Sequence, residues 1–117
     1  MNSETLCLFV TAIPGIPAAP EIADKNKHSV SLSWVPPAKD GGSPIKGYII
    51  EVQDEGSSSW IRVNDPENPH PTTEFTVPNL RELKRYKFRI VAVNDIGESL
   101  PSPQTTEVLL EDIQGNI

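Results

Sequence analysis

Few side chains in this sequence of 117 residues could act as an acid, a base or a nucleophile. The two histidines, His28 and His70, both fall in segments that read as loops, and His70 sits between two prolines. The single cysteine, Cys7, lies outside the predicted core, with nothing nearby in sequence to activate its thiol. Hydrolases and transferases need a nucleophile and a base assembled around the reacting atom. We therefore expect that this protein is not an enzyme.

Metal, phosphate and nucleic-acid binding also lack a pattern in the sequence. Cys and His residues do not cluster as zinc ligands do, and the carboxylates do not have the spacing of a calcium loop. The pair Gly41-Gly42 is not followed by the Lys-Ser/Thr of a phosphate loop and is better explained as a turn. The net charge of -6 argues against binding that depends on neutralising phosphates. We expect no cofactor, no metal and no nucleic-acid partner.

The charged residues are unevenly distributed along the chain. Half of the ten basic residues fall within nine positions, whereas residues 95–112 hold five acids and no base. This basic cluster is the candidate protein-contact surface, and its members are Arg81, Lys84, Arg85, Lys87 and Arg89. Two interpretations stay open: the cluster docks an acidic partner, or it is a solvated edge balanced by Glu51 and Glu82. The second is favoured by the small contribution of exposed ion pairs, usually less than about 1 kcal/mol.

The elements that must position these residues are short β-strands. Apolar and polar residues alternate with period two, as in half-buried strands, and clusters of Gly, Pro, Asn and Asp separate the runs. The 12 prolines make the proline content more than twice the average of about 5%, and this content disfavours long helices. Seven strands are predicted, near residues 21–23, 29–34, 48–53, 60–63, 74–77, 86–93 and 105–110.

This pattern predicts an all-β fold, a seven-stranded antiparallel β-sandwich of the immunoglobulin-like type. The longest strand, 86–93, is expected at the centre of a sheet. Tyr86 follows a corner that contains Leu80, so its ring can be buried while its hydroxyl bonds to upstream backbone. The predicted structural core comprises Trp34, Tyr48, Ile50, Leu80, Tyr86, Phe88 and Ile90.

The length fits one domain. Three prolines at three-residue spacing, from Pro14 to Pro20, favour an extended segment at its start. We predict an N-terminal extension or the end of a preceding domain over 1–13, the domain over 14–112 and a C-terminal tail over 113–117. The apolar run Leu6–Val10 is too short for a membrane helix or a signal peptide, so no membrane partner is expected.

Several residues that match these elements occur together in one known family. They are Pro17, Pro20, Trp34, Pro37, Gly47, Tyr48, Ile50, Glu51, Leu80, Tyr86, Ala92, Asn94, Gly97, Ser99, Pro101 and Ser102. Over residues 15–112 the sequence resembles a fibronectin type III domain. An antibody-type immunoglobulin domain is the weaker match, because Trp34 has no cysteine pair to pack against.

Within that family, the runs 40–51 and 86–94, with Trp60 between them, are similar to domains of titin-type giant sarcomeric proteins. The resemblance implies a non-catalytic spacer and protein-binding scaffold, one link in a multidomain muscle protein. The resemblance implies that its partners are adjacent immunoglobulin-like or fibronectin-like domains and thick-filament proteins. It also implies a location in the cytoplasmic sarcomere and an isolated domain that is monomeric. The alternative is an extracellular module of a cell-adhesion molecule or receptor. The sequence contains no Asn-x-Ser/Thr glycosylation acceptor, which favours the intracellular location over the extracellular one.

The first residues carry a faint internal repeat. Residues 2–10 resemble residues 103–110, the end of the domain itself. Either the first residues are the last strand of a preceding copy, or two short strand-like segments are similar by chance.

Overall fold

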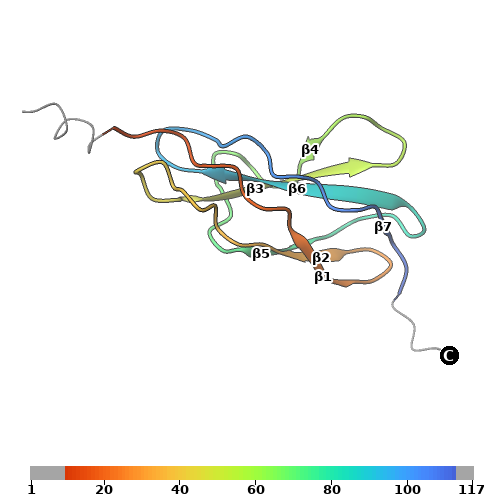
Figure 1. Ribbon diagram of the computed structural model, residues 1–117. Helices are drawn as coiled ribbons and strands as arrows, with labels where there is room; N and C mark the ends of the chain where they lie inside the picture. The colour runs from red at the N-terminus through yellow and green to blue at the C-terminus, as the bar shows by residue number, and fades with distance from the viewer. Residues whose placement is uncertain (1–9, 113–117) are drawn as a thin grey trace, which may run out of the picture.

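The computed structural model describes residues 10–112 (Figure 1). Cys7, most of the predicted N-terminal extension and the predicted C-terminal tail lie outside the described residues. Among residues 10–112 there is no helix that could cross a membrane. The strands are β1 (Glu21–Lys25), β2 (Val30–Ser33), β3 (Gly47–Asp54), β4 (Ile61–Arg62), β5 (Glu74–Val77), β6 (Arg85–Val93) and β7 (Val108–Leu109).

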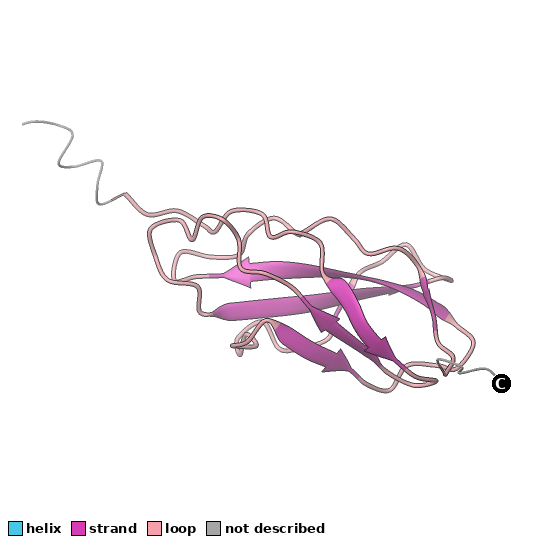
Figure 2. Ribbon diagram, turned by 60° about the horizontal axis from the view of Figure 1, so that its bottom comes forward, coloured by secondary structure: helices cyan, strands magenta, loops and turns pink. Residues whose placement is uncertain are grey.

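The strands form two antiparallel sheets packed face to face (Figure 2). One sheet has the order β1-β2-β5, and the other has the order β4-β3-β6-β7. The longest strand, β6, lies between β3 and β7 and pairs with β3 from Gly47↔Val93 to Asp54↔Tyr86. The predicted all-β, seven-stranded antiparallel sandwich is confirmed.

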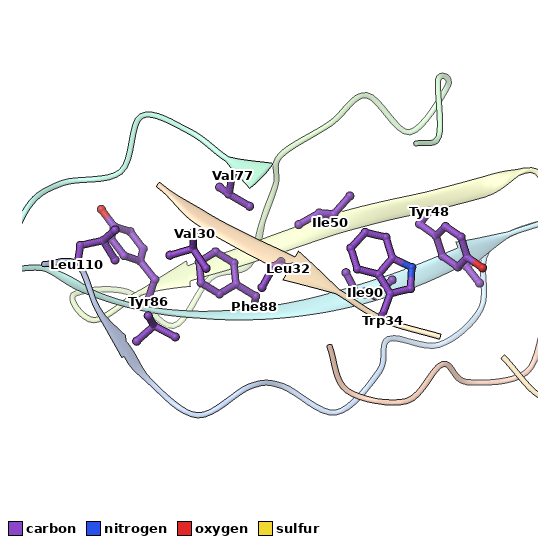
Figure 3. Close-up of a cluster of buried hydrophobic side chains, with 12 residues drawn as sticks. Val30, Leu32, Trp34, Tyr48, Ile50, Val77, Tyr86, Phe88, Ile90 and Leu110 are labelled. Carbon is purple, nitrogen blue, oxygen red and sulfur yellow. The ribbon is translucent and has the colours of Figure 1, made fainter. Parts of the chain in front are cut away.

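The core lies between the inner faces of the two sheets (Figure 3). Because side chains alternate along a strand, every second residue of β2, β3 and β6 points into this space. Fully buried members include Leu32, Ile50 and Phe88, while Leu80 is partly buried and packs against them from the β5–β6 connection. The side chains of Trp34, Tyr48, Tyr86 and Ile90 belong to the same cluster.

Trp34 and Tyr48 form an edge-to-face pair at one end of the core. Their ring centroids lie 5.4 Å apart with an interplanar angle of 71°. The buried indole Nε1 of Trp34 has no hydrogen-bond partner among residues 10–112, and Figure 3 shows this nitrogen on the side that faces Tyr48. The edge-to-face contact between the two rings offsets part of the cost of burying this donor. Burial raises the pKa of the Tyr48 hydroxyl above its ordinary value, so this group stays neutral.

Tyr86 ties the start of β6 to the connection that precedes it. Its ring is buried and its hydroxyl accepts a hydrogen bond of 3.0 Å from the backbone N–H of Arg81. The substitution Tyr86→Phe keeps the ring and removes this bond, so we expect it to lower the free energy of unfolding by about 1 kcal/mol in urea titrations. Tyr48→Phe is the control, because the Tyr48 hydroxyl has no hydrogen bond to another described residue. Equal losses in the two variants would contradict the role of the Arg81 contact.

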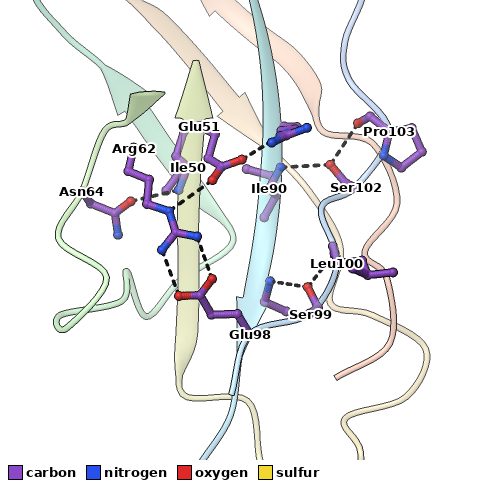
Figure 4. Close-up of polar contacts among 12 residues, drawn as sticks. Ile50, Glu51, Arg62, Asn64, Ile90, Glu98, Ser99, Leu100, Ser102 and Pro103 are labelled. Atoms are coloured by element: carbon purple, nitrogen blue, oxygen red, sulfur yellow. Dashed lines mark hydrogen bonds and ion pairs between the residues drawn. The ribbon is translucent and has the colours of Figure 1, made fainter. Parts of the chain in front are cut away.

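The segment before β7 runs along β6 without forming a regular strand. It makes contact at every third residue, where a backbone N–H donates to a β6 carbonyl and a side-chain hydroxyl accepts from a β6 N–H (Figure 4). These pairs, with distances between 2.8 and 3.1 Å, are Ser99 with Ala92, Ser102 with Ile90 and Thr105 with Phe88. Pro101 and Pro103 lack an N–H and fall between the contact positions. The regular strand is therefore shorter than the predicted 105–110.

Residues 10–15 form an N-terminal arm that lies against the loop 39–42. The N–H of Ala12 donates to the Gly41 carbonyl at 2.8 Å, and the N–H of Gly15 donates to the Lys39 carbonyl at 2.9 Å. Part of the segment that the sequence assigns to an extension thus contacts the domain. The arm, this loop and the turn 94–97 gather at one end of the sandwich, which we call the N-terminal pole (Figure 1).

Candidate protein-contact surface

The five basic residues of the candidate cluster come from two places in the fold. Arg85, Lys87 and Arg89 project from the outer face of β6, because they alternate with core residues along the strand. Arg81 and Lys84 belong to the connection between β5 and β6. The cluster is contiguous in sequence, but the structure divides it between a sheet face and a loop.

Two of the five cations are neutralised within the domain. The Lys84 Nζ lies 3.4 Å from Oδ2 of Asp54. The Arg89 Nε donates to Oε1 of Glu51 at 2.6 Å, and its guanidinium lies 4.3 Å above the ring of Trp60. A guanidinium held between a carboxylate and an aromatic face has little capacity left for a partner.

Glu51 is the centre of a four-member charge network on the outer face of the four-stranded sheet (Figure 4). Its side chain is 7% exposed and accepts hydrogen bonds from both Arg89 and Arg62. Arg62 then donates two more, of 2.9 and 2.6 Å, to the carboxylate of Glu98. Two arginines and two glutamates alternate, so the network has no net charge.

The network covers an apolar patch. Ile49, Val91 and Val93 project from β3 and β6 away from the core, yet all three are buried. Arg62 lies opposite Glu51 on one side of these residues and Glu98 lies opposite Val93 on the other, so their ion pair crosses the patch. The charged side chains thus keep water from the patch, and it is not open to a partner.

The Arg62–Glu98 pair gives unfolding a specific pH dependence. The hydrogen bonds from Arg62 hold the pKa of Glu98 below its ordinary value, and the same bonds raise that of Arg62. A carboxylate with a lowered folded-state pKa stabilises the fold above its unfolded pKa of about 4.3, and this contribution is lost as the pH falls through the folded value. In thermal melts, wild type should exceed Glu98→Gln in Tm at pH 7, and the gap should close in acid. A constant gap from pH 7 down to pH 2 would contradict this expectation.

The remaining cations of the cluster are Arg81, Arg85 and Lys87, which make no ion pair with any residue between 10 and 112. Arg85 and Lys87 line a small pocket together with three acidic residues, Asp54, Glu55 and Glu107. This part of the surface is therefore mixed in sign. The loop residue Arg81 is exposed.

A family model named Fibronectin type III domain matches residues 15–108. The chain belongs to the fibronectin type III family. The resemblance predicted from Trp34, Tyr48 and the residues around them is confirmed.

This fibronectin type III domain is similar to domains of muscle proteins. Human cardiac-type myosin-binding protein C is 40% identical over 98 residues, which cover 84% of this chain and 8% of that protein. A titin homolog of Caenorhabditis elegans is 33% identical over 104 residues, which cover 89% of this chain and a share of that protein that rounds to 0%. A crystal structure of titin domains A168 to A170 superposes with a TM-score of 0.80 at 33% identity, covering 87% of this chain and 34% of that chain. The chain thus spans a small fraction of the relatives it matches.

The histidines of this fibronectin type III domain hold loops in place. His28 Nδ1 lies 3.3 Å from the Leu80 carbonyl, and His70 Nε2 lies 2.7 Å from the Glu74 carbonyl. The ring of His70 also packs edge-on against Phe75 at 4.9 Å. Across the described part of the chain, no three His, Cys, Asp or Glu side chains gather as metal ligands would.

Sequence reasoning missed Arg62 and Glu98 as members of the charge network. They are 36 residues apart, Arg62 in β4 and Glu98 in the segment that follows β6, and neither stands out by its neighbours in sequence. Of the two acids expected to balance the basic cluster, Glu51 does so, whereas Glu82 forms no ion pair with a described residue. Knowledge of the strand register would have located this network, because Glu51 on β3 lies opposite Arg62 on β4 and opposite Arg89 on β6.

Proposed function

We propose that this fibronectin type III domain is a non-catalytic link in a multidomain muscle protein of the titin and myosin-binding protein C kind, where it acts as a spacer and a protein-binding scaffold. The observation that carries the proposal is its similarity to domains of such proteins over more than four fifths of the chain. No assembled nucleophile and base is found among the described side chains, which supports a role without catalysis.

The geometry of the sandwich supports the spacer role. The described chain starts at the N-terminal pole and ends beyond β7 at the opposite end of the molecule (Figure 1). Domains joined at such ends follow one another in a line, and each contacts only its neighbours. A pull on the two ends is therefore transmitted along the length of the sandwich.

The partners we propose are adjacent immunoglobulin-like or fibronectin-like domains of the same chain, and thick-filament proteins. The isolated domain is proposed to be a monomer, located in the cytoplasmic sarcomere. For lateral contact, the cations without an internal partner are the best candidates: Arg81, Arg85 and Lys87. Lys84 and Arg89 of the original cluster contribute less, because they are held by Asp54 and Glu51.

Immunolocalisation with an antibody against this segment tests the proposed setting. Regular stripes in the thick-filament zone of permeabilised striated muscle are expected. Staining of intact, unpermeabilised cells would instead favour the alternative, an extracellular adhesion or receptor module, and would overturn the sarcomeric proposal.

Co-sedimentation with purified thick filaments tests the lateral contact. The double charge reversal Arg81→Glu and Lys87→Glu should reduce the bound fraction at low salt. A matched double reversal of exposed lysines elsewhere, Lys27→Glu and Lys39→Glu, controls for net charge, because neither lysine forms an ion pair with a described residue. Equal loss in both double variants would show that total charge, and not this surface, governs binding.

A further inference from the structure

The turn 81–84, in the connection between β5 and β6, holds a leucine in a backbone conformation that suits glycine. The N–H of Lys84 donates to the Arg81 carbonyl at 3.3 Å, which closes this four-residue turn. Leu83, its third residue, has a φ of 65°. Glycine or asparagine is favoured at a third position with positive φ, because a larger side chain crowds the backbone there. Leucine therefore destabilises this turn relative to asparagine.

The Leu83 side chain has no packing that would offset this strain. It is 66% exposed and belongs to neither cluster of buried apolar residues. By contrast, Leu80 in the same connection packs against the core. A single exposed leucine is ordinary on a protein surface, but one that also strains its backbone points to a contact outside the domain.

The turn is held in one conformation by hydrogen bonds from both sides. The Leu83 N–H donates to the Leu110 carbonyl at 2.7 Å, and the Leu110 N–H donates to the Lys84 carbonyl at 3.0 Å. From the core side, the Tyr86 hydroxyl accepts from the N–H of Arg81. A turn fixed in this way loses little conformational entropy when it binds, so Leu83 is presented on a preformed surface.

The exposed charges beside Leu83 are mainly positive. Lys84 is neutralised by Asp54, which leaves Arg81 and Arg85 against Glu82 among the residues of the turn and the start of β6. None of these three forms an ion pair with a residue between 10 and 112. Because Arg85 projects from the outer face of β6, a partner that meets both Arg85 and Leu83 approaches from the side of the sandwich.

Resting on the lateral contact of the proposed function, we propose that Leu83 is the apolar anchor of that contact. Its partner is a protein surface that carries carboxylates around an apolar recess. The carboxylates pair with Arg81 and Arg85, and Leu83 fills the recess. Salt screens the charge pairs but not the burial of an apolar side chain, so the leucine supplies the part of the affinity that persists when the ionic strength rises.

Co-sedimentation of the 117-residue chain with purified thick filaments, at low and at high salt, tests the anchor. Leu83→Asn removes the apolar side chain and places a residue that tolerates positive φ. We expect its affinity to be about tenfold lower than that of wild type at both salt concentrations, because burying a leucine contributes at least this factor. The double reversal of Arg81 and Lys87 should instead weaken binding mainly at low salt.

Two variants serve as controls. Leu83→Met keeps an apolar side chain of similar volume and should bind within about twofold of wild type. Leu100→Asn removes a leucine that is 62% exposed in the segment beside β6, outside the basic cluster, and should bind as wild type does. Equal affinities of wild type and Leu83→Asn would overturn the anchor and leave the lateral contact intact. If wild type did not bind filaments at all, both would be overturned.

Thermal melting gives a readout that does not depend on the partner. Because the leucine strains the turn, Leu83→Asn should raise Tm by about 2 to 4 °C although it weakens binding. A lower Tm would show that Leu83 stabilises the fold, and its assignment to an external contact would then be wrong.

The following domain of a multidomain parent is the competing occupant, because the chain leaves the sandwich beside this turn, at Leu110. A longer piece that includes that domain should bind filaments with the affinity of the 117-residue chain and lose about tenfold on Leu83→Asn. If Leu83→Asn had no effect in the longer piece, the following domain would cover Leu83, and the lateral partner would be overturned.

Discussion

Replacing Trp34 with alanine is expected to lower the free energy of unfolding by about 3 to 5 kcal/mol. The indole is 6% exposed, packs against Tyr48 at one end of the core and belongs to the continuous core cluster. Its removal leaves a cavity that the surrounding strands cannot close, because both sheets are held by their own hydrogen bonds. Urea titration of the single domain measures the loss directly.

Trp60→Ala is the matched control for this experiment. Trp60 is half-buried on the outer face, where it lies against the Arg89 guanidinium. Its loss should cost about 1 kcal/mol, the contribution of a partly exposed cation–π contact. If Trp34→Ala were no more destabilising than Trp60→Ala, the assignment of Trp34 to the core would be wrong.

The second large effect is expected for Glu51→Ala, about 2 to 3 kcal/mol of unfolding free energy. Removing one member of a buried ion pair usually costs about 3 to 5 kcal/mol, because the other charge stays buried without a partner. Here both arginines are partly exposed and regain some water, and Arg62 keeps Glu98, so the loss is smaller. The patch of Ile49 and Val91 also loses part of its cover.

Two comparisons isolate the charge network from other effects of this substitution. Glu82→Ala removes an exposed glutamate without an ion pair in the described chain and should change stability by less than about 0.5 kcal/mol. Glu51→Gln keeps the volume and weakens both arginine contacts, so it should lie between wild type and Glu51→Ala. The network would be refuted as a stabilising feature if Glu51→Ala and Glu82→Ala behaved alike.

The strands could be predicted because their signal is local. In β2, β3 and β6, every second residue is apolar for at least two repeats, and prolines or glycines end the runs. The last strand was predicted too long, because Thr105 to Leu110 reads as a continuous run. The chain up to Thr105 is instead held to β6 by the hydroxyls of Ser99, Ser102 and Thr105, which act as acceptors at every third residue. A period of three does not resemble a strand in sequence.

The candidate surface was harder to predict because its contacts join distant segments. The basic cluster is continuous along the chain, but Glu51 and Asp54 from the neighbouring strand neutralise two of its members. The hydrogen bonds from the Asn94 amide to the Ala12 and Asp40 carbonyls could not be predicted either, because they depend on where both the arm and the loop 39–42 lie. Charge counting finds a polarised sequence, whereas the pairing of charges follows from strand order and register.

The hydroxyl contacts of residues 99–105 also bear on aggregation. A free sheet edge invites another strand to pair with it, and domains linked in one chain meet at high effective concentration. The segment 99–105 that lies beside β6 contains Pro101 and Pro103, which have no N–H to donate. Regular strand pairing with β6 on this side is confined to the two residues of β7. This edge offers no continuous row of donors to a neighbouring copy. An edge interrupted in this way disfavours pairing with a strand from another copy.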